Sequence, residues 1–112
     1  MITTQEARRK ADTGMTMAAE HADDVTPRWT DVAEQFLTVY AVRNWLFMGE
    51  EVVEAAREWG LVEPPDARAW GAVFKRAARA GVIVKDGYGK ARTSNLSMKP
   101  VWRSLVYVGG DE

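Results

Sequence analysis

The chain has 112 residues, of which 46% are hydrophobic and 28% are charged, and its formal net charge is −1. This length and composition predict one globular domain, and the absence of cysteine excludes disulfide bonds and cysteine-bearing zinc sites. Because no apolar run reaches the roughly 18 residues of a membrane span and the first residues lack a hydrophobic signal segment, we expect a cytoplasmic protein without membrane contact.

A helix is predicted at the start of the chain, where Thr3 and Glu6 have the spacing of a capping box. Its apolar positions recur at helical spacing as far as residue 22, at Met15, Ala18, Ala19 and Ala22. We interpret residues 1–25 as an arm that packs lightly on the domain or on a second copy, and we rank this above nucleic-acid contact by the basic run 8–10. His21 has no histidine or cysteine partner, so no metal site is predicted.

Two further helices are predicted around a short apolar run. The first starts within residues 26–30 and ends at Asn44. Its buried face is expected to contain Val32, Phe36, Val39 and Tyr40 and to be broadened by Leu37 and Ala41. Residues 45–48 are too few for a helix and predict a brief buried strand. The next helix covers residues 49–59, and Gly60 is its expected left-handed stop.

A turn with two prolines, residues 61–65, precedes a helix predicted over residues 66–80. At about 100° per residue, one side carries Trp70, Val73, Phe74 and Ala77, and the opposite side carries Arg68, Lys75 and Arg79. Arg76 lies beside the centre of this cationic stripe, where pairing with a carboxylate is the alternative to binding. The pattern favours a helix that buries one face and offers the other to an anion; a solvated basic face is the alternative.

A β-hairpin is predicted after this helix. Residues 82–84 predict a strand, residues 86–89 a turn, and residues 101–108 contain the returning strand. The segment between them carries Lys85, Tyr88, Lys90, Arg92 and Lys99. Tyr88 is expected to be exposed at the turn. The five tryptophans are Trp29, Trp45, Trp59, Trp70 and Trp102, and core packing is predicted for most of them.

This order of elements predicts a mainly α fold with a small β-hairpin, the α+β winged helix-turn-helix, over residues 26–108, between the N-terminal arm and a frayed tail at 109–112. The run 14–104 also resembles a group of small winged helix-turn-helix proteins of bacteriophages and prophages, chiefly through PPDARAWGAVFKRAARAGVI and, at matching spacing, GMTMAAEHA, TPRWTDVA, FMGEEV and VWRS. The resemblance implies DNA binding in transcription control or replication, in the host bacterial cytoplasm. It carries over only the structural positions Trp70, Gly71, Phe74, Gly81 and Trp102.

The distribution of charge also favours nucleic acid. Residues 1–60 contain 6 basic and 11 acidic residues, giving −5, whereas residues 61–112 contain 9 and 5, giving +4. A basic segment inside a nearly neutral protein is typical of a surface that binds a polyanion. We therefore predict binding to double-stranded DNA, with Arg68 at base edges, Lys75, Arg76 and Arg79 near phosphates, and Tyr88, Lys90 and Arg92 of the wing against the backbone or minor groove.

Other functions receive less support from the sequence. No phosphate-binding loop, zinc-protease motif or nucleophile elbow is present, so we predict neither an enzyme nor a cofactor. The main alternative is an adaptor that uses a winged-helix scaffold to bind a phage or host protein rather than DNA. A homodimer formed through the N-terminal helix is compatible with either function.

Overall fold

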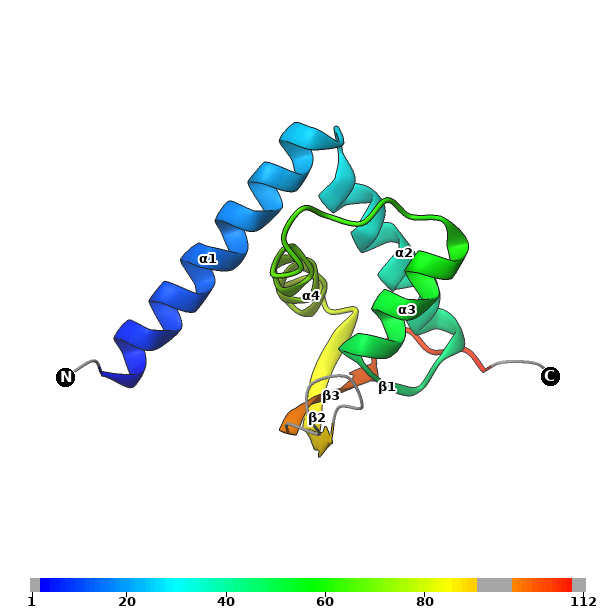
Figure 1. The fold of residues 1–112 in the computed structure, drawn as a ribbon. Coiled ribbons are helices and arrows are strands. Elements are labelled where there is room, and N and C mark those ends of the chain that lie inside the picture. The colour runs from blue at the N-terminus through cyan, green and yellow to red at the C-terminus, as the bar shows by residue number, and fades with distance from the viewer. Residues whose placement is uncertain (1–2, 91–97, 110–112) are drawn as a thin grey trace.

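The structure, a computed structural model, describes residues 3–90 and 98–109. In these residues it contains four helices and a three-stranded antiparallel sheet, which confirms the predicted α+β class (Figure 1). The elements follow one another in the predicted order: α1 (Thr4–Val25), α2 (Trp29–Arg43), β1 (Leu46–Met48), α3 (Gly49–Trp59), α4 (Ala69–Arg79), β2 (Ile83–Lys90) and β3 (Met98–Ser104).

The helix α4 lies at the centre of the molecule. Figure 1 shows it almost end-on, between α1 and the α2–α3 pair, with the sheet beneath. Its apolar face is buried as predicted, and Trp70 meets Trp29 of α2 edge to face with 5.4 Å between ring centroids. Phe74 stacks on Trp102 of β3 at 5.6 Å. The Trp29 indole donates a hydrogen bond to the carbonyl of Val62 at 2.7 Å, which fastens the loop before α4 to α2.

Local sequence signals account for the helix ends. The Thr3 hydroxyl accepts a hydrogen bond from the Glu6 amide at 3.0 Å, and the Glu6 carboxylate accepts one from the Thr3 amide at 2.9 Å, so the predicted capping box is present. The helix α1 then continues to Val25, past the expected end near residue 22. At the end of α3, Gly60 has a φ of 108°, the left-handed conformation predicted for it.

The hairpin differs from its prediction. Residues 86–89, expected to form the turn, belong to β2, and Tyr88 pairs with Pro100 of β3. Between Lys85 and Tyr88 the register shifts, because a bulge absorbs the extra residue while strand pairing continues beyond it. The connection between β2 and β3 therefore falls in residues 91–97, outside the described part of the chain. In the sheet, β3 lies between β1 and β2.

Burial corrects three predictions about apolar residues. Val39, Trp45 and Trp59 were expected to pack in the core, but they are exposed, with 64% of Trp59 accessible. The buried stripe of α2 contains Trp29, Ala33, Leu37 and Ala41, which turns Val39 outward. Trp59 is the last residue of α3. Among the aromatic rings of the described residues, its ring contacts only that of the partly buried Phe36, at 5.5 Å between centroids. Phe47 is the fully buried residue of β1.

Candidate nucleic-acid interface

Arg68 is held by a neighbouring carboxylate. Its guanidinium donates to both Asp66 oxygens, with Nη2 at 2.7 Å from Oδ2, and its backbone amide donates to Oδ1 at 2.9 Å. These hydrogen bonds to Arg68 lower the pKa of Asp66 from 3.8 to about 2, because they stabilise the carboxylate form. Asp66 lies in the turn before α4, whose N-cap is Arg68 without a side-chain cap hydrogen bond, so the helix begins at Ala69 and not at residue 66 as predicted. Arg68, which was predicted to contact base edges, is exposed and hydrogen-bonded to Asp66.

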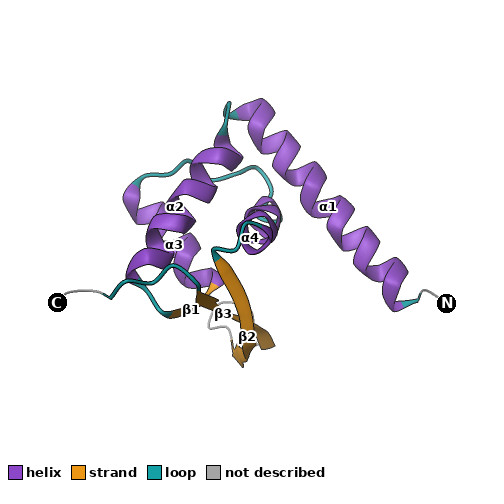
Figure 2. Cartoon of the chain, turned by 180° about the vertical axis from the view of Figure 1, so that it is seen from behind, coloured by secondary structure: helices purple, strands orange, loops and turns teal. Residues whose placement is uncertain are grey.

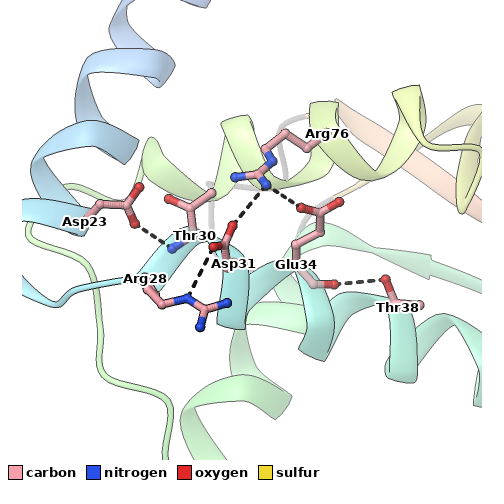
Figure 3. Close-up of polar contacts among 7 residues, drawn as sticks. All are labelled: Asp23, Arg28, Thr30, Asp31, Glu34, Thr38 and Arg76. Carbon is pink, nitrogen blue, oxygen red and sulfur yellow. Dashed lines mark hydrogen bonds and ion pairs between the residues drawn. The ribbon is translucent and has the colours of Figure 1, made fainter.

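Two more cations of α4 form ion pairs with other elements. Lys75 Nζ lies 2.6 Å from Asp12 of α1, which joins α4 to the N-terminal helix. Arg76 bridges Asp31 at 3.1 Å and Glu34 at 3.0 Å, both on α2 (Figure 3). The carboxylate alternative for Arg76 is thus confirmed, and Lys75, which was predicted to lie near a DNA phosphate, also has a carboxylate partner. The partners lie 63 and 45 residues away, beyond the reach of a local pattern.

The outward face of α4 is covered by α1. Met15 of α1 lies against Gly71, and a methyl group added at Gly71 would stand 2.9 Å from Met15 Cγ. Gly14 lies close enough to Arg68 that an added methyl would be 3.0 Å from its Nη1. Ala72 is only partly accessible. Figures 1 and 2, from opposite sides, both show α1 running past α4 on the side away from α3. The middle of the face predicted to enter the DNA major groove is therefore packed against α1, while Arg68 and Arg79 at its two ends are exposed.

Cations without carboxylate partners are found elsewhere. Among the described residues, no acidic group lies within ion-pair distance of Arg79 at the end of α4. The same holds for Arg43 at the end of α2 and for six residues at the start of α1 and in the hairpin: Arg8, Arg9, Lys10, Lys85, Lys90 and Lys99. Tyr88 is exposed, as predicted. Arg92, another predicted contact, lies outside the described residues. The partnerless cations thus belong mainly to α1 and the hairpin.

A groove separates these two elements. It has a volume of about 640 Å³ and is lined by Arg8, Asp12 and Met15 of α1, Gly71, Phe74 and Lys75 of α4, and Lys85, Pro100 and Trp102 of the sheet. We call it the basic groove, because three cations face one carboxylate along it. Arg8 lines the groove on the α1 side and Lys85 lines it on the sheet side. The rings of Phe74 and Trp102 form its apolar lining. Arg8 and Lys85 thus place positive charge without a carboxylate partner on both sides of the groove.

The sequence pointed to this groove only in part. Lys85 and Lys99 were noted as cations of the wing but were not among the predicted contacts, and the run 8–10 was assigned to a solvated arm. The signal that identifies them is the absence of an ion-pair partner among the described residues, whereas Asp12 and Asp66 pair with Lys75 and Arg68. Sequence shows the spacing of charges along one helix, but it does not show which charges from distant segments meet.

Comparisons with known proteins add no identification. No protein-family model, curated protein or solved structure matches the chain. Across residues 3–90 and 98–109, every helix is too short or too polar to cross a lipid bilayer. Over the same residues, there is no group of three or more histidine, aspartate or glutamate side chains that could hold a metal ion. The functional proposal must therefore rest on charge and geometry.

Proposed function

We propose that this chain is a winged-helix DNA-binding protein that contacts the backbone of duplex DNA from the two walls of the basic groove. Support for the winged-helix assignment comes from the order α2, β1, α3, α4, β2, β3 and from β1 joining the hairpin in one sheet. The resemblance to phage and prophage proteins adds the setting, which is transcription control or replication of a phage genome.

The observation that carries the proposal is the separation of paired from partnerless cations. On α4, Arg68, Lys75 and Arg76 are neutralised by carboxylates of the chain. On the walls of the groove, Arg8 and Lys85 have no such partner within the described residues. A cation that is already paired gains little from a phosphate, whereas a free cation displaces the counterions condensed on DNA. The free cations therefore mark the surface that a polyanion would bind most strongly.

Fluorescence anisotropy with a short random-sequence duplex tests the proposal. Binding should be measurable at low salt and should weaken steeply as salt is added. Neutralisation of four to six phosphates gives a slope of about −4 to −5 for log K against log salt. Undetectable binding at low salt by folded protein would contradict the proposal.

A protein-binding adaptor is the second candidate, because an apolar surface is exposed near the end of α2. Trp45 and Leu46 are half exposed, and the Trp45 ring contacts that of Tyr107 at 5.8 Å. The amide of Val108 donates to the carbonyl of Val42, which holds the C-terminal segment beside this surface. An adaptor would show no salt-sensitive DNA binding. The substitution Trp45→Ser would weaken binding of the adaptor to its protein partner without unfolding the adaptor, because Trp45 lies outside the core.

A further inference from the structure

We infer that α4 is not a reading helix in this protein and that the chain binds duplex DNA by its backbone, regardless of base sequence, with α1 kept in place on α4. This inference rests on the proposed function and specifies its ligand. A typical helix-turn-helix protein reads base edges with side chains of its second helix in the major groove. Here the apolar face of that helix is buried, and Gly71 and Lys75 on its opposite face lie against α1.

Apolar burial, close approach and an ion pair all stabilise the contact between α1 and α4. The α1 stripe Ala18, Ala19 and Ala22 is buried, and Ala22 is fully so. Small residues on both helices allow their backbones to approach closely, with Gly71 of α4 receiving the Met15 side chain. An ion pair, Lys75 to Asp12, closes the same contact toward the start of α1. Removing α1 would expose this apolar stripe to water, which is unfavourable.

The side chains of α4 also leave little with which to read bases. Discrimination between base pairs requires side chains that reach donors and acceptors on base edges, most often arginine, asparagine or glutamine. The long polar residues Arg68, Lys75 and Arg76 are held by carboxylates, and Ala72 and Ala78 are too short. Arg79 is the exception in α4, but it occupies the last residue of the helix. The helix therefore offers at most one free arginine.

The basic groove needs α1 where it is. Arg8 on α1 and Lys85 on β2 line opposite walls, and Met15 and Asp12 of α1 line the space between. If α1 swung away to expose α4, the Arg8 wall would leave and the groove would no longer exist. Two-sided contact and major-groove reading by α4 are thus alternatives. The free cations on both walls favour two-sided contact, which is recognition of backbone charge rather than of bases.

An engineered disulfide distinguishes these alternatives. The Cβ that Gly71 would gain lies 3.8 Å from Met15 Cβ, which is about the mean separation in disulfides, and the wild-type chain has no cysteine. The variant Met15→Cys/Gly71→Cys can therefore be locked by oxidation. We expect the oxidised protein to bind the random duplex within about twofold of its reduced form. A loss of about tenfold or more on oxidation, recovered on reduction, would overturn the inference.

Each single-cysteine variant, treated with the same oxidant, is the matched control, because neither can form the intramolecular bridge. Mass spectrometry confirms the bridge, and circular dichroism confirms that the locked protein is folded.

Selection from a randomised duplex pool tests the second half of the inference. Wild-type protein should retain DNA without enriching any base at any position. Specific DNA-binding proteins prefer their sites by about 10³-fold or more, so a single enriched motif would overturn sequence independence. If the wild type binds no DNA at low salt, the proposed function fails and the inference with it. If the wild type binds but the locked variant does not, only the inference fails.

Discussion

Asp66 stands two residues before Arg68, and this short spacing changes what the arginine can do. Both of its carboxylate oxygens accept hydrogen bonds from the guanidinium, and one also accepts from the Arg68 amide. An arginine used in this way stiffens the entry to α4. Arg68 is therefore a weaker contact for base edges than its position on the helical wheel suggested. Guanine is read by two guanidinium N–H groups of one arginine, and those of Arg68 already donate to Asp66.

The pKa of Asp66 reports this interaction. Since the folded pKa is depressed from 3.8 to about 2, the carboxylate stabilises the fold above about pH 4, and that contribution is lost as pH falls from about 4 to about 2. In Arg68→Ala the pKa should return toward 3.8, as measured by NMR titration of the side-chain carboxyl carbon. The control Arg79→Ala should leave it low. An unchanged pKa in Arg68→Ala would show that the hydrogen bonds are absent in solution.

Two tryptophans with similar sequence signals should differ in their contribution to stability. Trp70 is 6% exposed and contacts Trp29 and Phe74, whereas Trp59 is 64% exposed. Trp70→Ala should lower the free energy of unfolding by about 3 to 5 kcal/mol, and Trp59→Ala by less than about 1 kcal/mol. Urea denaturation measures both. Equal losses would mean that Trp59 packs more deeply than the structure indicates.

At the scale of elements, the helix pair α1 and α4 depends on a glycine for its close approach. A methyl group at Gly71 would collide with the Met15 side chain, so Gly71→Ala must shift it. Alanine is otherwise the better helix former, by about 1 kcal/mol. Whether Gly71→Ala stabilises or destabilises the protein should therefore depend on which residue is at position 15.

We expect Gly71→Ala to destabilise the wild type but to stabilise Met15→Ala, by up to about 1 kcal/mol, because the truncated side chain leaves room for the methyl group. A double-mutant cycle from urea denaturation gives the coupling energy. If Gly71→Ala has the same effect in both backgrounds, Met15 does not occupy the position described here.

Sequence patterns identified the elements better than their partners. The capping box at Thr3, the stop at Gly60 and the inward side of Trp70 are local properties, and each was predicted. The packing of α1 over the cationic side of α4 was not, because an apolar stripe shows which face is buried but not against what. A stripe of alanines is especially uninformative. The bulge at Lys85 to Tyr88 was read as a turn because glycine serves in both.

At the scale of the whole molecule, ion pairs between the two halves of the chain cancel part of their charge asymmetry. Acidic residues of the first half, Asp12, Asp31 and Glu34, neutralise cations of α4 from the second half. The partnerless cations that remain in the described residues belong mainly to the start of α1 and to the hairpin, and two of them, Arg8 and Lys85, line the basic groove. The account depends on these residues, rather than α4, being the surface that meets DNA.

Two double variants with the same change in net charge test this claim most directly. Lys85→Ala/Lys90→Ala removes partnerless cations of the hairpin, and Arg68→Ala/Arg76→Ala removes paired cations of α4 and its N-cap that do not line the groove. Anisotropy with the random duplex over a salt series, on variants shown to be folded, gives the slope of log K against log salt. The slope should become shallower by about 2 in the hairpin variant and by less than about 0.5 in the α4 variant. Equal changes, or a larger change in the α4 variant, would contradict the account.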